Sequence, residues 1–161
     1  LAIVPATLMA AAFPALAETV SHAPQRAIRL HRTTLAVLGA AGVSACAVMM
    51  LVPELIVGLL YGEGFAGSAR VLFALGPCAL LTFINYLQTH MLVALGEVRA
   101  QMVISLSLIG VNVAANALLI PRFGGAGAAW ATALTELGLL AACTPFVHRG
   151  LQRALAEAEA A

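Results

Sequence analysis

The chain has 161 residues, of which 62% are hydrophobic and only 9% are charged. Soluble domains carry about 25% charged residues, and a chain of this length cannot bury so much apolar surface in a water-soluble core. The composition therefore favours an integral membrane protein over an unusually apolar soluble helical domain. The formal net charge of +1 says little about partners, and we expect no nucleic-acid partner.

Long apolar runs divide the chain into predicted membrane spans. A span needs about 20 mostly apolar residues, and four runs meet this length, at residues 33–52, 71–95, 101–120 and 125–147. A fifth run, over residues 1–17, is slightly shorter, and we interpret it as a partial span. Because the segments between the runs are short and rich in turn residues, they predict antiparallel neighbours in one bundle.

The fold class follows from these runs. The first complete run continues towards Tyr61, with Pro53 and Glu54 interrupting it, and we expect Glu54 to be a solvated residue at a helix start. The sequence predicts an all-α fold, a polytopic transmembrane helix bundle over residues 1–147 with four full spans plus a partial N-terminal one. Residues 148–161 are polar enough to leave the membrane, and we expect a cytoplasmic polar tail that forms a surface helix.

The arginine residues predict how the bundle is oriented. With a loop at residues 18–32 on the cytoplasmic side, six of the eight basic residues are cytoplasmic and only Arg70 and Arg122 are outside. This distribution follows the positive-inside rule for short loops. The six are Arg26, Arg29, Arg32, Arg99, Arg149 and Arg153. The first three of these are expected to determine topology and to contact lipid phosphates.

The first run has an alternative interpretation as a signal peptide. Residues 15–17 read Ala-Leu-Ala, which resembles a signal-peptidase site. Cleavage there would place residues 18–32 outside and invert the arginine distribution, so we favour a truncated transmembrane helix, with the chain starting inside that helix.

Reactive side chains are few and scattered. Cys46, Cys78 and Cys143 lie far apart in apolar runs without any CxxC spacing, so we expect inert buried thiols. The four histidines are scattered, and no GxSxG, HExxH or paired intramembrane acid is present. We therefore expect neither catalysis, nor a cofactor, nor a metal site.

Three turn segments carry a resemblance to a known family. They are LLYGEGF at residues 59–65, ALGEVRAQ at residues 94–101, and NALLIPRFGGAGAAWAT at residues 116–132. In this order and spacing they resemble the C-terminal half of polysaccharide-unit flippases, within the multidrug/oligosaccharidyl-lipid/polysaccharide exporter superfamily. The resemblance covers residues 50–140.

The resemblance implies two six-helix lobes around a cavity that opens alternately to each side of the bacterial inner membrane. The chain would supply part of the second lobe, as a C-terminal fragment that pairs with a missing N-terminal lobe and does not transport alone. The implied substrate is an undecaprenyl-diphosphate-linked oligosaccharide for a surface polysaccharide, with membrane lipids as further partners. A drug/cation antiporter or a lipid II flippase of the same superfamily, and a non-transporting membrane scaffold, are the alternatives.

The glycine-rich segment after residue 120 predicts a tight reversal between two spans. Pro121 has no amide proton and is expected to end one span, while Gly124, Gly125 and Gly127 permit the dihedral angles of the turn. The last span then begins with small residues, which let helix backbones approach closely in lipid.

Polar side chains within the spans are the candidates for a substrate cavity. Such groups face neighbouring helices or a water-filled space because they are costly in lipid. At about 100° per residue they form stripes on single helix faces. The candidates are Thr82, Asn85 and Thr89 on one span, Ser105, Asn112 and Asn116 on the next, and Glu136 on the last. The alternative for each stripe is helix-to-helix hydrogen bonding, worth about 0.6 kcal/mol per contact.

Glu136 is the one carboxylate well inside a span, about eleven residues from either end of residues 125–147. A carboxylate there finds a hydrogen-bond donor or takes up a proton. We expect it to face the bundle interior with Thr132 and Thr135, while Leu134 and Leu137 point elsewhere. It is either a coupling group for an ion gradient or a structural partner of a threonine or asparagine.

Overall fold

The computed structural model describes residues 2–160, apart from the side chain of Glu63. Within these residues the chain forms six α-helices and one 3₁₀ turn, with no strand. They are α1 (Ile3–His22), α2 (Pro24–Leu51), α3 (Pro53–Tyr61), η1 (Glu63–Phe65), α4 (Ser68–Ala94), α5 (Val98–Phe123) and α6 (Gly125–Ala160). By length and composition all of the α-helices except α3 can cross a membrane. The expected all-α bundle is confirmed.

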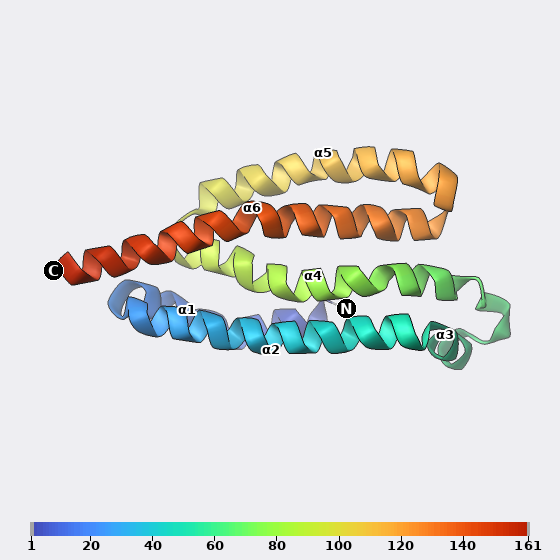
Figure 1. Cartoon of the computed structure of the whole chain (residues 1–161), viewed down its shortest axis with the longest axis horizontal. Coiled ribbons are helices and arrows are strands. Elements are labelled where there is room, and N and C mark those ends of the chain that lie inside the picture. Colours follow the sequence, from blue (N-terminus) through green and yellow to red (C-terminus); the bar gives the residue numbers. More distant parts are fainter. Residues whose placement is uncertain (1, 161) are drawn as a thin grey trace.

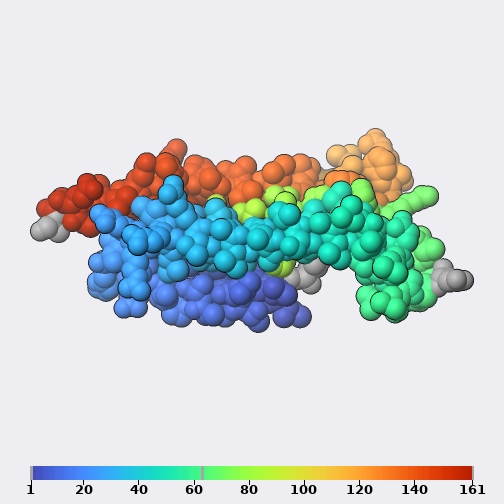
Figure 2. All heavy atoms as spheres, turned by 60° about the horizontal axis from the view of Figure 1, so that its bottom comes forward, coloured from blue at the N-terminus to red at the C-terminus, as the bar shows by residue number. Residues whose placement is uncertain are grey.

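The long helices lie side by side along the longest axis of the molecule (Figure 1). α4 is central, because it packs against α2, α6 and α1, whereas α5 packs mainly against α6. Consecutive long helices reverse direction, so α4 and α6 run parallel to each other (Figure 1). In Figure 2, α1 lies along the first part of α2 and does not reach α3.

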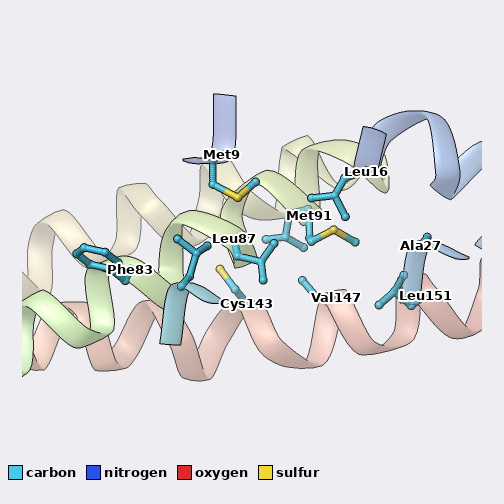
Figure 3. Packing of buried hydrophobic residues seen from close by; sticks show 11 residues of the cluster. Met9, Leu16, Ala27, Phe83, Leu87, Met91, Cys143, Val147 and Leu151 are labelled. Carbon is cyan, nitrogen blue, oxygen red and sulfur yellow. The ribbon is translucent and has the colours of Figure 1, made fainter. Parts of the chain in front are cut away.

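The apolar core lies in the half of the bundle where α1, α2, α4 and α6 meet. Figure 3 shows side chains from all four helices converging there. Fully buried members include Met9 and Leu16 from α1, and Leu87 and Met91 from α4. By contrast α5 is the least buried of the five long helices and exposes many large apolar side chains. Such a surface is typical of a helix that faces lipid or another protein segment.

The break between α2 and α3 lies where the sequence predicts it. α2 ends at Leu51 and α3 begins at Pro53, as the interruption in the first complete run predicted. Proline suits the first helical position because an amide proton there has no partner within the helix, so that the lack of one costs no hydrogen bond. Glu54 lies exposed in the first turn of α3, as expected of a solvated residue at a helix start.

Three local expectations were wrong. Residues 18–32 form no loop, because α1 continues to His22 and α2 begins at Pro24, so that only Ala23 separates them. The polar tail is not a separate surface helix, because α6 continues to Ala160. Its last residues are mostly alanine, leucine, glutamate and arginine, which are strong helix formers.

Pro121 does not end its span, which was the third error. α5 continues through it to Phe123 and ends at Gly124, whose φ of 59° is in the left-handed region. A proline in the last turn removes only one hydrogen bond of the helix, and the Gly124 amide still donates to Ile120 O at 2.8 Å. The left-handed glycine therefore ends the helix.

The predicted reversal after α5 is as tight as its glycines suggest. A Cβ atom at Gly127 would collide with the backbone carbonyl of Leu119 on α5. A Cβ atom at Gly125 would lie 3.1 Å from Cγ2 of Val71 on α4. The small residues at the start of α6 thus allow two neighbouring helices to approach it.

The six arginines of the predicted cytoplasmic group gather at one end of the bundle. The α1–α2 junction, the α4–α5 turn and the C-terminal part of α6 all lie at that end (Figure 1). Arg153 on α6 contacts Glu97 in the α4–α5 turn, with Nη1 3.2 Å from Oε1. Arg70 at the start of α4 and Arg122 near the end of α5 lie at the opposite end. The bundle thus has six arginines at one end and two at the other. That the end with six arginines faces the cytoplasm stays a prediction.

Candidate functional site

Glu136 is the centre of a polar contact between α4 and α6. The Thr82 hydroxyl donates to Glu136 Oε1 at 3.2 Å. The Asn85 side-chain amide donates to Glu136 Oε2 at 2.6 Å and to the Glu136 backbone carbonyl at 2.8 Å. The prediction that this carboxylate faces a neighbouring helix is confirmed, and Leu134 and Leu137 are exposed as expected.

Helical spacing explains why these groups meet. Thr82 and Asn85 are three residues apart and therefore lie on one side of α4. On α6 the buried residues Ala129 and Ala133 precede Glu136 on the face that receives them. Their small side chains let the helices approach closely, and the Cys78 thiol reaches the Ala129 carbonyl at 3.1 Å. The polar contact is thus held by close packing on its N-terminal side.

A second polar contact joins α6 to α5. The Asn112 amide donates to the Thr135 hydroxyl at 3.0 Å, and the Asn116 amide donates to both oxygens of Asn112 at 2.9 Å. Since Thr135 and Glu136 are adjacent, α6 presents polar groups to both of its neighbours at one level. Ser105 is half-buried and lies outside this contact.

The other candidate hydroxyls bind within their own helices. Thr89 donates to the Asn85 carbonyl at 2.8 Å, and Thr132 donates to the Ala128 carbonyl at 3.0 Å. Thr89 nevertheless lines a cavity of about 140 Å³ together with Thr82, Asn85 and Glu136. The structure therefore brings four of the seven predicted cavity residues to one small space, and places Asn112 and Asn116 at the α5–α6 contact.

Gln88 is a buried polar residue that the sequence analysis did not include among the candidates. His31 Nε2 on α2 donates to Gln88 Oε1 at 3.3 Å, and Gln88 Nε2 donates to the Thr144 hydroxyl on α6 at 3.4 Å. One side chain thus connects three helices. Its position three residues after Asn85, within the same span, was the available signal.

A larger groove opens beside Gln88 at the arginine-rich end. It has a volume of about 470 Å³ and lies between α2, α4 and α6. Its polar lining residues are His31, Arg32, Gln88, Thr144, His148 and Gln152. Of the three N-terminal arginines expected to contact lipid phosphates, Arg32 lines this groove, and Arg26 and Arg29 line a neighbouring one of about 450 Å³.

The cysteines match the sequence-based interpretation in part. The three cysteines are free, with Cys78 and Cys143 buried and Cys46 half-buried. Over residues 2–160, no cluster of three or more histidine, cysteine, aspartate or glutamate side chains is placed to hold a metal ion.

The fold and the polar contacts define a class of protein, a multi-pass membrane protein with polar groups between its central helices. No protein-family model matches the chain, and neither a curated protein nor a solved structure does. The arrangement of the polar groups therefore carries the functional interpretation.

Proposed function

We propose that the chain forms part of a transporter that flips lipid-linked oligosaccharides across the bacterial inner membrane, by alternating access, for surface polysaccharide biosynthesis. The observation that carries this proposal is the row of polar side chains on α4, α5 and α6, far from the helix ends. Polar groups at membrane depth typically mark substrate or ion pathways.

The chemistry of this row suits a sugar. Apart from Glu136 its members are neutral amides and hydroxyls, namely Thr82, Asn85, Thr89, Asn112, Asn116 and Thr135. Such groups hydrogen-bond sugar hydroxyls in both donor and acceptor roles without requiring a counter-charge. Their present partners are one another, Glu136 and backbone carbonyls of their own helices, so a substrate would exchange hydrogen bonds with them as the helices separate.

The turns support the resemblance to polysaccharide-unit flippases. Each of the three resembling segments includes a point where the chain reverses, between α3 and α4, between α4 and α5, and between α5 and α6. The arginine-rich end, with its grooves beside Arg26, Arg29 and Arg32, suits the diphosphate of a lipid carrier on the cytoplasmic side. Flipping moves the substrate without making or breaking a bond, so no catalytic residue is required.

The test is reconstitution of the full-length protein that contains this chain. Purified protein in liposomes is given a fluorescent undecaprenyl-diphosphate trisaccharide, and dithionite added outside reports how much probe has crossed. We expect faster crossing than in protein-free liposomes. Ethidium transport without lipid crossing would favour the drug/cation antiporter. A preference for lipid II would favour that branch, and no transport of any probe would favour a scaffold.

A further inference from the structure

The short helix α3 lies across the end of the bundle and not along it. In Figure 1 α3 is seen nearly end-on, at the end opposite the six arginines, whereas the long helices run across the view. Figure 2 shows it projecting beyond α2 on the side where α1 lies. Its nine residues cover about 14 Å at about 1.5 Å per residue, which is less than half of the hydrocarbon thickness of about 30 Å. α3 is therefore not a further span.

The level of α3 in the membrane follows from α2. Residues 33–51 of α2 are uncharged, and Arg32 precedes them. At about 1.5 Å per residue these residues cover about 28 Å, which is close to the hydrocarbon thickness of about 30 Å. With Arg32 at one boundary of the hydrocarbon, the end of α2 at Leu51 lies at the other. Since α3 begins at Pro53, it lies where acyl chains meet headgroups.

Two leucines of α3 face away from the bundle. Leu55 and Leu59 are one helical turn apart and therefore lie on one face, and they are 67% and 82% exposed. Val57, on the opposite face, is only 4% exposed. Leu51 at the end of α2 is also exposed, so the apolar face of α3 continues the apolar surface of the spans. In water such a continuous apolar surface would be unfavourable, whereas lipid covers it without cost.

The space between α3 and α4 is apolar as well. It has a volume of about 400 Å³, and Ile56 and Leu60 on α3 line it together with Leu72 on α4. Tyr61 and Ser68 are its only lining residues with a polar side chain. Water in such a space would find too few of the two to four hydrogen-bond partners that it needs. An acyl chain of a lipid can fill the space without losing hydrogen bonds.

Aromatic and acidic side chains flank the apolar face. The rings of Tyr61 and Phe65 have their centroids 5.8 Å apart, and both side chains are exposed. Tyrosine is enriched where a membrane meets water, because its ring is apolar and its hydroxyl is polar. Glu54 is exposed and lies about 100° from Leu55 around the helix. Its carboxylate can therefore stay in water while the leucines enter lipid.

We propose that α3 is an interfacial helix that binds the lipid surface, with Leu55 and Leu59 among the acyl chains and Glu54 in the headgroup region. The leaflet is the one opposite the six arginines, which the positive-inside rule makes the outer leaflet. Because α3 connects α2 to α4, its attachment holds both helices at a fixed depth, and with them the polar contact at Glu136. This inference rests on the spans and does not depend on the proposed transport function.

The test is the depth of a nitroxide label in the full-length protein that contains this chain, in liposomes of phosphatidylcholine and phosphatidylglycerol. Leu59→Cys and Leu55→Cys are labelled one at a time, after the other cysteines have been replaced. Power-saturation EPR compares collisions with oxygen, which partitions into lipid, and with a nickel chelate, which stays in water. We expect both labels to collide more with oxygen and to lie about 5–10 Å into the boundary between headgroups and acyl chains.

Glu54→Cys is the matched control on the same helical turn, and its label should collide more with the nickel chelate than the label at position 59. Leu134→Cys, at an exposed position within the span of α6, should lie deeper than either. The two leucine positions are independent, so one stays informative if the other variant does not fold. Equal nickel accessibility at positions 54, 55 and 59 would place α3 in water and overturn the proposal. Low accessibility to both reagents at positions 55 and 59 would also overturn it, because a protein segment or a second copy would then cover this face.

Discussion

Thr82 on α4 and Glu136 on α6 are 54 residues apart in the chain, yet the hydroxyl of one donates to the carboxylate of the other at 3.2 Å. With Asn85 on the second carboxylate oxygen, both oxygens of Glu136 have donors from a single neighbouring helix. This satisfies a group whose exposure to lipid at the helix centre would cost about 2.5–3.5 kcal/mol.

Glu136→Leu should destabilise the bundle by about 1–3 kcal/mol, because it leaves buried polar groups of α4 without their partner. Glu136→Gln should cost less than about 1 kcal/mol, since its carbonyl oxygen can accept from Asn85 while its amino group donates to Thr82. Denaturation in mixed micelles, followed by circular dichroism, measures both. Leu134→Val, at an exposed position of the same helix, is the control. Equal losses for leucine and glutamine would contradict the hydrogen-bonding role.

Gly127→Ala should destabilise the protein by about 1–3 kcal/mol, as overpacking typically does. The new methyl group would meet the Leu119 backbone, which cannot rotate away as a side chain can. Gly110→Ala in α5 is the matched control, because a Cβ atom there has no neighbour within 4 Å. Alanine in a helix interior is favoured over glycine by about 0.8–1.0 kcal/mol, so the control should be neutral or stabilising. If both variants unfold alike, α5 and α6 do not approach at Gly127.

The spans were predictable because apolar run length depends only on local composition. The ends of the helices were less predictable, since they depend on backbone geometry. Pro121 was expected to end a helix that in fact continues to Phe123 and ends at Gly124. The sequence predicted that Glu136 contacts a threonine or an asparagine, because a carboxylate at that depth needs a hydrogen-bond donor. The sequence could not identify which residues are these partners, since the pairing of α4 with α6 is set by packing along both helices. Gln88 was missed because a single stripe was sought on α4, whereas this central helix has neighbours on several sides.

Gln88→Leu should destabilise the protein by about 1–3 kcal/mol, although leucine is more soluble in lipid. The substitution leaves the half-buried His31 Nε2 without its partner on α4 and removes the hydrogen bond to the Thr144 hydroxyl, which still donates to the Leu140 carbonyl. Gln88→Glu is a useful companion, because a carboxylate still accepts from His31 but does not donate to Thr144 when ionised. Melting temperatures in the same detergent compare the two. A leucine variant more stable than the parent would show that the three-helix connection contributes nothing to stability.

The arginine distribution predicts the orientation of the bundle in the membrane. Cysteines are introduced singly at Arg99, in the α4–α5 turn region, and at Arg122, near the end of α5, in a protein whose three native cysteines are replaced by alanine. An impermeant maleimide added to intact cells should label position 122 and not position 99, because the positive-inside rule places the six-arginine end in the cytoplasm. Lysed cells serve as the control, since both positions are exposed in the structure and both should then react. Labelling of position 99 alone in intact cells would show the opposite orientation. The lipid-linked substrate would then have to enter from the other side than proposed.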